Sequence, residues 1–481
     1  MTAVARPALD LSALPEPVLD DAPEFLDLYR VAWQLAWEHV VEREGAPRSP
    51  YLDEGFDPET IWIWDTCFMV HFAKYAPDLF PGVESLENFY RPMYDDAPTT
   101  LLIQHPDNPP LFAWSEEEYV RHTGDLGRVR WLLDAGYLQR HFASFESVAP
   151  GSVFAFSRVP TTIERVERGY RWNGVGSGMD NTPRAPHQAV GGTDGDILWF
   201  DAAAQQALAA RSIATLARLV GDAELAAEYD AHHARLAALV DDFWDDDVRL
   251  YCDRIGSPPH TSTGVRTPAA FWPLLAGVSS TDQAAALAES LGDPGCFGGT
   301  VPWASVARDD PTFRSTGHYW RGGVWVPSAY VSARALADAG HGELARQATR
   351  ALLRHMARTY AEYEPASIWE CYAPDRPSPA TAKDDVEIAR PDFCGWSALA
   401  PIAMLIEHVL GFRVDAPAGI VHWRTAGPGR HGIRRLRCGE VLLTAIRDGD
   451  HIDVECNGPL TLVVDDVPYA LTAGEQRLTA R

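Results

Sequence analysis

The sequence predicts an all-α fold, an (α/α)6 toroid, followed by a small C-terminal antiparallel β unit. Apolar residues recur at helical spacing from residue 25 to about residue 411, and the helices come in pairs separated by short GD, GH or DP breaks. From about residue 415 the apolar period changes from 3.6 to 2. Stacked helical hairpins, about a dozen helices in all, can close into a ring.

Three segments are expected from this pattern: a Pro-rich leader at 1–21, the helical domain at 22–413 and the β unit at 414–481. The clearest helices are expected at 25–41, 197–222, 224–244, 323–340, 343–363 and 393–411. The strands are expected at IRRLRC, VLLTAIR, HIDVEC, LTLVVDD and VPYALT, with DGD and NGP turn signals between them. We expect the β unit to cover an edge of the helical domain, and a separate binding module is the alternative.

Composition excludes several classes of protein. The 481 residues carry 67 acidic and 41 basic side chains, a formal net charge of −26, so nucleic acid and anionic membrane surfaces would repel the protein. Seven cysteines, odd in number and without a CxxC pair, are expected to be reduced thiols in a cytoplasmic protein. The N-terminus does not have the pattern of a secretory signal, and no long uncharged apolar run occurs. The sequence does not indicate an oligomeric state.

Aromatic and polar residues concentrate in five loops between the predicted helices. Aromatic faces stack on the apolar C–H face of a sugar ring, and neighbouring polar groups bind its hydroxyls. Polar groups buried without a partner would be costly, which favours a pocket over the alternative that the tryptophans only fill a wide core. The loops therefore predict a carbohydrate pocket, and they read IWIWDTCF (61–68), IQHPDNPPLFAW (103–114), RWNGVGSGMDNTPR (171–184), GHYWRGGVW (317–325) and SIWECYAPDRPS (367–378).

Other motifs of catalysis or cofactor binding do not fit. GVGSG at 174–178 follows no apolar strand and departs from GxGxxG, and it does not match GxSxG either. There is no HExxH motif, EF-hand loop or clustered Cys/His set. We therefore expect no cofactor and no catalytic metal.

Asp180 stands out within GSGMDNTPR. Gly176 and Gly178 permit a close approach of the backbone, and Pro183 stiffens the exit of the loop. These neighbours predict a carboxylate held in a defined direction. An Asx-turn or a helix N-cap is the structural alternative for an Asp before Asn-Thr-Pro.

The motifs IWIWDTCF, QHP, GSGMDNTPR, YWRGGVW, IWECYAPD and FCGWSAL occur in this order between residue 59 and about residue 411. Together they resemble the bacterial mannosylglycerate and glucosylglycerate hydrolases of glycoside hydrolase family 63 and, more distantly, the trehalases. The resemblance implies an (α/α)6 toroid that hydrolyses α-glycosidic bonds with inversion. The chain departs from the family pattern at Thr182, Ala185 and Gly323, which bears on the substrate more than on the reaction.

The resemblance also implies roles for single residues. Asp180 would be the general acid and Glu370 the general base, while Trp64 and Asp65 would hold the sugar that is cleaved. His105 and Asp107 in the QHPDNPP loop could shape the leaving-group side. Further substrate-binding residues are expected at Trp62, Gln104, Arg184, Tyr319, Trp320, Arg321, Trp325, Tyr372 and Trp396.

The chemistry of inversion sets the requirements for the two carboxyl groups. One must be protonated against the leaving oxygen and the other ionised behind a water, about 6.5–9.5 Å away. We expect burial to raise the pKa of Asp180, and hydrogen bonds or solvent to keep Glu370 ionised. Arg184 would oppose protonation of Asp180, so it is expected to face the leaving group or a structural carboxylate.

Glu370 is preferred as the base because Trp369 and Tyr372 flank it, whereas KDDVE at 383–387 is expected to be a solvated loop. The alternatives for the base are Glu362, Glu364, Asp385, Glu387 and Asp392.

The function expected from the sequence is an inverting α-glycoside hydrolase. It would release a terminal sugar, glucose first and mannose second, from a short oligosaccharide or sugar conjugate. A sugar epimerase or isomerase on the same architecture is one alternative, with His105 and His318 as its candidate acid and base. The other is a non-catalytic carbohydrate-binding protein in which Asp180 and Glu370 only bind hydroxyls.

Overall fold

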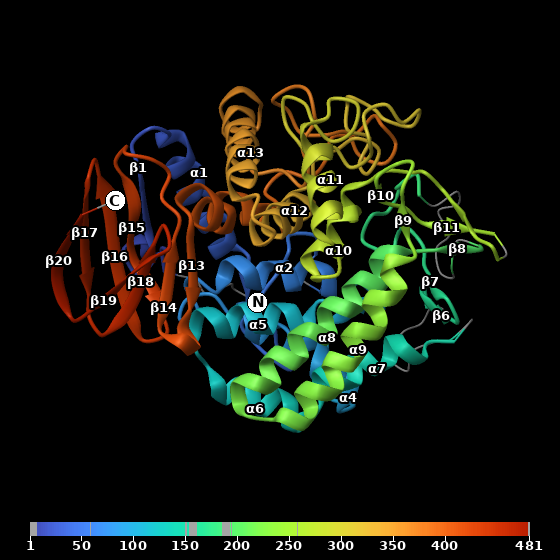
Figure 1. The fold of residues 1–481 in the computed structure, drawn as a ribbon, viewed down its shortest axis with the longest axis horizontal. Coiled ribbons are helices and arrows are strands. Elements are labelled where there is room, and N and C mark those ends of the chain that lie inside the picture. The colour runs from blue at the N-terminus through green and yellow to red at the C-terminus, as the bar shows by residue number, and fades with distance from the viewer. Residues whose placement is uncertain are drawn as a thin grey trace.

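A helical body and a C-terminal β unit make up the chain (Figure 1). The computed structural model describes residues 7–57, 59–149, 152, 161–184, 193, 195–256 and 258–479. Ala185 and residues 1–6 of the expected leader therefore lie outside the described residues. None of the described helices is long and apolar enough to cross a membrane.

Helices buried along most of their length form the inside of the body. Every residue of α2 is buried, and the same holds for a π-helix near the end of the body, so neither has a solvent face. These inner elements are α2 (Ile63–Ala73), α5 (Phe112–Thr123), α8 (Phe200–Val220), α12 (Val326–Asp338) and the π-helix Ala400–Leu410.

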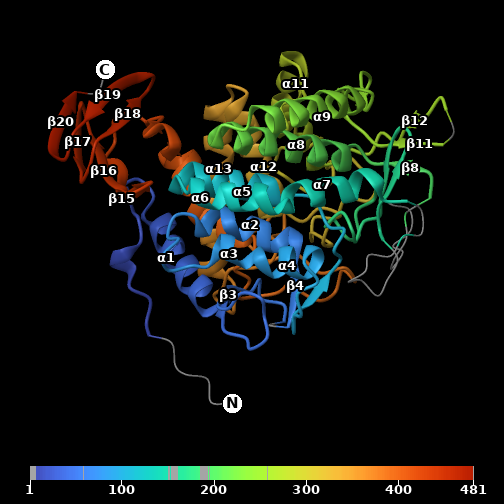
Figure 2. The same ribbon diagram turned by 90° about the horizontal axis from the view of Figure 1, so that it is seen from below.

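The outer helices bury one face and expose the other. Helix α9 packs along α8, α13 along α12, and α1 against the π-helix, so these three outer helices cover inner ones (Figure 2). The longer outer helices are α1 (Pro23–Glu38), α6 (Leu126–Ala135), α7 (Tyr137–Ser147), α9 (Ala223–Asp241), α11 (Thr281–Gly292) and α13 (Gly342–Glu362). The shorter helices are α3 (Gly82–Ser85), α4 (Glu87–Tyr94) and α10 (Trp272–Leu275).

The turn between α8 and α9 explains one of the short breaks in the sequence. Gly221 adopts a left-handed conformation, with φ of 83°, and its N–H bonds the carbonyls of Ala217 and Arg218. The side chain of Asp222 then accepts a hydrogen bond from the N–H of Leu225 and caps α9. A C-terminal glycine followed directly by an N-cap reverses the chain in two residues.

The predicted helices agree with the structure to within a few residues, with one difference of type. The segment expected at 393–411 forms a short 3₁₀ turn at Ser397–Leu399 and then a π-helix rather than an α-helix. The N–H of Gly411 bonds the carbonyl of Ile406, five residues earlier, as in a π-turn.

Two sheets form the β unit, at the left of Figure 1. The five-stranded sheet has the order β1-β15-β16-β17-β20 and is antiparallel throughout; the four-stranded sheet has the order β13-β14-β18-β19. Their bounds are β1 (Glu16–Leu19), β15 (His431–Cys438), β16 (Val441–Asp448), β17 (His451–Cys456) and β20 (Gly474–Thr479), then β13 (Phe412–Asp415), β14 (Ile420–Trp423), β18 (Leu460–Val464) and β19 (Val467–Leu471).

The β unit differs from the expectation in two respects. Strand β14 pairs with β18 in parallel, so the unit is not purely antiparallel. Strand β1 comes from the segment that was expected to be a leader, and it adds to the sheet at β15. Glu16 on β1 pairs with Arg434 and Arg435, which holds β1 against β15. The boundary expected between residues 413 and 414 falls inside β13, and the division into domains stays a prediction.

Short strands complete the helical body. Two of the sheets that they form contain or adjoin the aromatic motifs. The pair β4 (Thr60–Trp62) and β5 (Leu102–Gln104) is parallel, and a sheet of the order β12-β11-β8-β7-β6 lies at the other side. Its strands are β6 (Glu164–Val166), β7 (Gly169–Arg171), β8 (Ile197–Leu198), β11 (Arg254–Ile255) and β12 (Thr261–Ser262). The remaining pairs are β2 (Val40–Val41) with β3 (Tyr51–Leu52) and β9 (Trp244–Asp245) with β10 (Leu250–Tyr251).

Trp423 joins the β unit to the helical body. Its side chain is fully buried and stacks on Phe412, with ring centroids 4.6 Å apart. Its indole N–H donates to the carbonyl of Leu410, the last residue of the π-helix, at 3.0 Å. One side chain on β14 thus caps the final helix and packs on the strand that follows it.

We expect Trp423→Ala to destabilise the protein by about 3–5 kcal/mol, because it removes a fully buried indole and leaves a cavity at the joint. The conservative change Trp423→Phe keeps a stacked ring but loses the hydrogen bond and one ring of the indole, so it leaves a smaller cavity and its cost should be smaller. Urea unfolding followed by circular dichroism measures both. Wild-type stability of Trp423→Ala would contradict the role assigned to this joint.

Candidate active site

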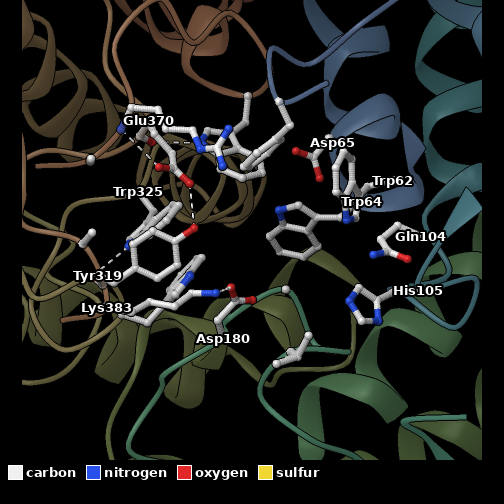
Figure 3. A pocket seen from close by; sticks show the side chains of 18 of the residues that line it. Trp62, Trp64, Asp65, Gln104, His105, Asp180, Tyr319, Trp325, Glu370 and Lys383 are labelled. Atoms are coloured by element: carbon white, nitrogen blue, oxygen red, sulfur yellow. Dashed lines mark hydrogen bonds and ion pairs between the residues drawn. The ribbon is translucent and has the colours of Figure 1, made fainter. Parts of the chain in front are cut away.

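One cavity of about 700 Å³ collects most of the residues that the sequence predicts for a sugar site (Figure 3). It opens where the segments that lead into the inner helices meet, because its lining residues precede α5, α8, α12 and the π-helix or stand before or at the start of α2. Of the predicted site residues, those that line it are Trp62, Trp64, Asp65, Gln104, Asp180, Tyr319, Trp320, Trp325, Glu370 and Trp396. Three other predicted residues, Arg184, Arg321 and Tyr372, do not line this cavity.

The β4–β5 pair positions one wall of the cavity. The parallel register places Trp62 opposite Gln104, so both side chains arise from the same sheet edge. Strand β4 continues directly into α2, whose first turn carries Trp64 and Asp65. The pairing of three residues in each strand therefore brings the IWIWDTCF motif next to the QHP motif, although the two are about 40 positions apart in the sequence.

Asp65 is buried among other acids. Burial raises the pKa of this carboxyl well above its usual value, and the charges of Glu370, Asp180 and Asp53 add to the rise. One of its oxygens has no hydrogen-bond partner among the described residues. A neutral carboxyl in this position can both donate to and accept from sugar hydroxyls.

The GSGMD loop lies directly against the first turn of α2. Gly178 has φ of 80°, and a Cβ atom at this position would lie 3.0 Å from the indole ring of Trp64. At Gly176 a Cβ atom would overlap the side chain of Thr162. The glycines are therefore required for close approach, as predicted, and the loop presents Asp180 to the cavity.

Asp180 carries an ion pair that the sequence did not indicate. Its carboxylate pairs with the ammonium of Lys383, and its side chain is 22% exposed. Burial raises the pKa of Asp180, and the Lys383 charge opposes that rise. The raised pKa of Asp180 is the shift that was expected for a general acid.

Asn181 anchors this loop to the YWRG loop. Its amide nitrogen donates to the carbonyl of His318 at 3.0 Å, and its side-chain oxygen accepts from the N–H of Trp320 at 2.7 Å. Its main-chain carbonyl accepts from the guanidinium of Arg321 at 3.0 Å. Arg321 was predicted to bind substrate; it does not line the cavity, and its guanidinium holds the backbone next to Asp180.

Glu370 is held by fixed neutral donors. Its Oε1 accepts from the hydroxyl of Tyr319 at 2.6 Å, and its Oε2 accepts from the main-chain N–H of Arg390 at 3.3 Å. Burial raises the pKa of Glu370, and these two hydrogen bonds oppose the rise. The hydrogen bonds that were expected to favour the ionised form are present, although burial is the larger influence.

Tyr372 and Trp396 support Glu370 from behind. The N–H of Trp369 donates to the hydroxyl of Tyr372 at 3.1 Å, so Tyr372 fixes the backbone next to Glu370 rather than lining the cavity as predicted. The indole N–H of Trp396 donates to the carbonyl of Glu370 at 2.9 Å. The ring of Trp396 also lies on the cavity wall.

Arg184 is a structural residue and not a substrate-binding one. Its side chain is completely buried and its guanidinium forms paired hydrogen bonds, all of 2.7–2.8 Å, with both oxygens of Asp201 and of Asp253. The guanidinium also lies over the rings of Trp199 and Phe200. Of the two orientations expected for Arg184, the structure has the one towards a structural carboxylate.

The KDDVE run at 383–387 was expected to be a solvated loop, yet it forms part of the cavity wall. Lys383, Asp384, Glu387, Ile388 and Arg390 line the cavity although most of them are exposed. Only the charges of this loop are visible in the sequence, and an exposed charged run is ordinarily a solvated surface. Phe56, Asp57, His105, Asn108 and Val175 also line the cavity.

The alternative candidates for the base have other partners or positions. Asp385 accepts hydrogen bonds from the hydroxyls of Thr316 and Thr381, and Asp392 accepts one from Ser367. Glu362 pairs with Arg358 on the exposed end of α13, and Glu364 is exposed and does not line the cavity. Glu387 lines the cavity but lies at its exposed rim. Glu370 is thus the buried carboxylate that shares the cavity with Asp65 and Asp180.

The described part of the chain offers no set of three or more His, Cys, Asp or Glu side chains grouped to hold a metal ion. Asp107, which was expected to shape the leaving-group side, accepts from the hydroxyl of Thr162 at 2.6 Å and fixes the loop instead. Burial lowers the pKa of His105, so this ring on the cavity wall is neutral.

A helical body whose loops bring carboxyl groups and tryptophans into one cavity defines a carbohydrate-processing class of protein. Residues 96–384 match the model of the mannosylglycerate hydrolase MGH1-like glycoside hydrolase domain. Because the match spans more than half of the chain, the protein belongs to this family of glycoside hydrolases.

Two solved structures and one curated protein illustrate the relationship. The chain is 24% identical over 442 residues to a probable mannosyl-oligosaccharide glucosidase of Schizosaccharomyces pombe, covering 79% of this chain and 52% of the relative, or about half its length. A mannosylglycerate hydrolase of glycoside hydrolase family 63 from Thermus thermophilus, in complex with glucose, has a TM-score of 0.59 and 18% identity, covering 78% of this chain and 99% of its own. A sialidase structure has a TM-score of 0.70 and 14% identity, covering 97% of this chain and 41% of its own. At these identities the structural likenesses show the fold alone.

We expect Arg184→Met to destabilise the protein by about 3–5 kcal/mol, because it leaves Asp201 and Asp253 buried without their cation. Asp253→Asn is the matched control, since it removes one of two negative charges while Arg184 keeps Asp201, and its cost should be smaller. Thermal and urea unfolding measure both variants. Equal stability of Arg184→Met and wild type would show that the cluster does not hold the loop.

Proposed function

We propose that the protein is an inverting α-glycoside hydrolase, in which Asp180 is the general acid and Glu370 the general base. It releases a terminal sugar, glucose first and mannose second, from a short oligosaccharide or sugar conjugate. The observation that carries the proposal is that these two carboxyl groups, 190 positions apart in the sequence, line one aromatic cavity and have different kinds of partner.

The partners suit the two roles. Glu370 receives hydrogen bonds from Tyr319 and from the N–H of Arg390, which stabilise the ionised form that a base needs to activate water. Asp180 is paired mainly with the Lys383 ammonium, and burial favours its protonated form. Figure 3 shows the two side chains on different walls, which leaves room for a sugar ring between them.

The aromatic residues support binding of a sugar ring. Trp62, Trp64, Trp325 and Trp396 present ring surface at the cavity, and Asp65 and Gln104 offer polar groups beside them. This combination of apolar faces and oriented polar groups is typical of a saccharide subsite.

The charge of the cavity favours a neutral leaving group. Among the described lining residues, the cationic side chains are Lys383 and Arg390, and they face a larger set of carboxyl groups: Asp57, Asp65, Asp180, Glu370, Asp384 and Glu387. An acidic leaving group would meet net repulsion, whereas a sugar or polyol would not. The names of the relatives support either sugar, since one is a glucosidase and another a mannosylglycerate hydrolase.

We further propose that the helical body closes as an (α/α)6 toroid over residues 22–413. The layering of buried inner helices and half-exposed outer helices supports this closure. A toroid brings every interhelical loop of one end to a common rim, which accounts for the convergence of distant motifs on one cavity.

The epimerase alternative has less support from the site. His318 does not line the cavity, and its Nε2 donates to the carbonyl of Lys383 at 3.0 Å. Of the two candidate histidines, only His105 lines the cavity. An epimerase of this kind needs an acid and a base on opposite faces of the sugar, and one histidine does not supply both.

Proton NMR of the purified protein with a panel of α- and β-linked disaccharides, trehalose, glucosylglycerate and mannosylglycerate tests the reaction. We expect release of a β-anomer from an α-linked glucoside. Asp180→Asn and Glu370→Gln should each lower kcat by about 10²–10⁴-fold, because each removes one partner of the proton transfer.

Different results would point elsewhere. If the α-anomer is the first product released from an α-linked substrate, the enzyme retains the anomeric configuration and does not invert it. Full activity in either variant would remove that carboxyl group from its role. Interconversion of free monosaccharides without bond cleavage would favour the epimerase, and binding without turnover would favour a carbohydrate-binding protein.

Tyr319→Phe tests the role of Glu370 as the base. The hydroxyl of Tyr319 stabilises the ionised carboxylate, so its loss should raise the pKa of Glu370 further. A base must be ionised to act, and the acidic limb of the pH profile of kcat/KM should therefore move to higher pH by about one unit. The ring that packs on Trp325 is retained in the variant. An unmoved acidic limb would contradict the assignment.

A further inference from the structure

Lysine occurs only twice in the sequence, at positions 74 and 383, although lysine and arginine together number 41. Lys74 is buried between Glu118 and Glu407, at 2.9 Å and 3.0 Å. Lys383 pairs with Asp180 on the cavity wall. The chain thus uses arginine for nearly all of its cations, and lysine at the proposed catalytic acid is a departure from that usage.

Lysine and arginine differ in what they do beside a carboxylate. A guanidinium forms two parallel hydrogen bonds to a carboxylate and holds it rigidly, as Arg184 does to Asp201. An ammonium is a compact charge at the end of a flexible four-carbon chain. It can neutralise a carboxylate and still move away when another group takes its place.

The backbone below Lys383 is firmly held. The carbonyl of Lys383 accepts a hydrogen bond from His318, and Asp385 accepts from the hydroxyls of Thr316 and Thr381, both at 2.6 Å. Asp384 accepts from the N–H groups of the two residues that close the turn. The loop therefore fixes where the Lys383 side chain starts.

The end of the side chain has few constraints. The Lys383 side chain is 50% exposed, and its ammonium lies 5.1 Å from the centre of the Tyr319 ring. Among the described residues, Lys383 forms a single ion pair, the one with Asp180. Such an exposed ion pair is weak in water and readily exchanged, in contrast to the buried pairs of Arg184.

Other groups around Asp180 do not replace this cation. His105, from the loop after β5, is neutral because burial lowers its pKa. Asp65 on α2 and Glu370 after α13 are acids, and Tyr319 from the YWRG loop is a neutral phenol whose pKa burial raises. When the Lys383 ammonium moves away, Asp180 faces only neutral groups and carboxyl groups among the described residues that contact this part of the cavity.

We propose that Lys383 is a positioning residue that keeps Asp180 ionised in the free enzyme and turns to the leaving group when substrate binds. The leaving-group hydroxyl then accepts a hydrogen bond from the ammonium. A hydronium ion of the solvent gives one proton to the Asp180 carboxylate: one O–H bond of the hydronium breaks, the carboxyl O–H bond forms, and a water molecule is left. The inference rests on the proposed function of Asp180. It adds that substrate binding controls the protonation of this carboxyl group.

The pH profiles of kcat/KM and kcat test this directly, because the first reports the free enzyme and the second the enzyme–substrate complex. The acid must be protonated, so its pKa sets the basic limb. In the wild type we expect the basic limb of kcat/KM at lower pH than that of kcat. In Lys383→Met the basic limb of the kcat/KM profile should move to higher pH by about one unit, whereas the basic limb of the kcat profile should stay in place.

Matched variants separate this effect from others. Lys383→Arg keeps the charge and should keep the low limb of kcat/KM. Lys383→Gln removes it with a polar side chain and should reproduce the shift of Lys383→Met. Arg477→Met removes one charge from an exposed pair on β20, within the β unit, and should leave both limbs in place. Thermal midpoints identify any variant that fails to fold.

Two outcomes overturn the inference. One is coincidence of the two basic limbs in the wild type; the other is an unmoved kcat/KM limb in both Lys383→Met and Lys383→Gln. Either result with an inactive Asp180→Asn leaves the proposed function intact and removes only the role of Lys383. Retained activity in Asp180→Asn instead removes the acid itself, so the two failures are distinguishable.

Discussion

Arg184 and its two carboxylate partners form the contact on which the geometry of the site depends. Asp201 lies in the first turn of α8 and Asp253 follows β10, so three distant segments meet at one guanidinium. Charges taken out of water are tolerated only when every hydrogen bond is formed, and this leaves the cluster almost no freedom. Since Arg184 ends the loop that carries Asp180, the position of the proposed acid follows from this cluster and from the tether at Asn181.

The two proposed catalytic carboxyl groups differ in the permanence of their partners. Glu370 is bonded by Tyr319 and a main-chain N–H, and its own backbone is held by Trp396, so its surroundings are fixed before a substrate arrives. Asp180 faces a half-exposed ammonium. A base that must stay ionised benefits from fixed donors, whereas an acid must gain and lose a proton in each cycle. The difference in partners therefore follows the difference in chemistry.

The sequence predicted those parts of the structure that have a local or chemical signal. Helical periodicity located α8, α9, α12 and α13, and the unusual density of tryptophan and acid in the motifs located the cavity. It missed β1, because a strand of four residues has no measurable period and pairs with β15 more than 400 positions away. It missed Lys383, because exposure and charge are the marks of a solvated loop, and only the fold shows that this loop borders a cavity. The sequence left two orientations open for Arg184, because proximity to Asp180 does not indicate which way a long side chain points; the structure has the one towards the buried carboxylates of Asp201 and Asp253.

The electrostatics of the whole molecule and of the cavity act in the same direction. A net charge of −26 gives a negative field around the protein, and the carboxyl groups of the cavity add to it at short range. In such surroundings a carboxyl group that is not paired with a cation gains a proton easily, because the neutral form escapes the repulsion. Burial raises the pKa of both Asp65 and Asp180; neighbouring carboxyl groups add to the rise at Asp65, whereas the Lys383 charge opposes it at Asp180. A single movable cation is then enough to decide whether Asp180 is charged, which a cavity rich in arginine would not allow.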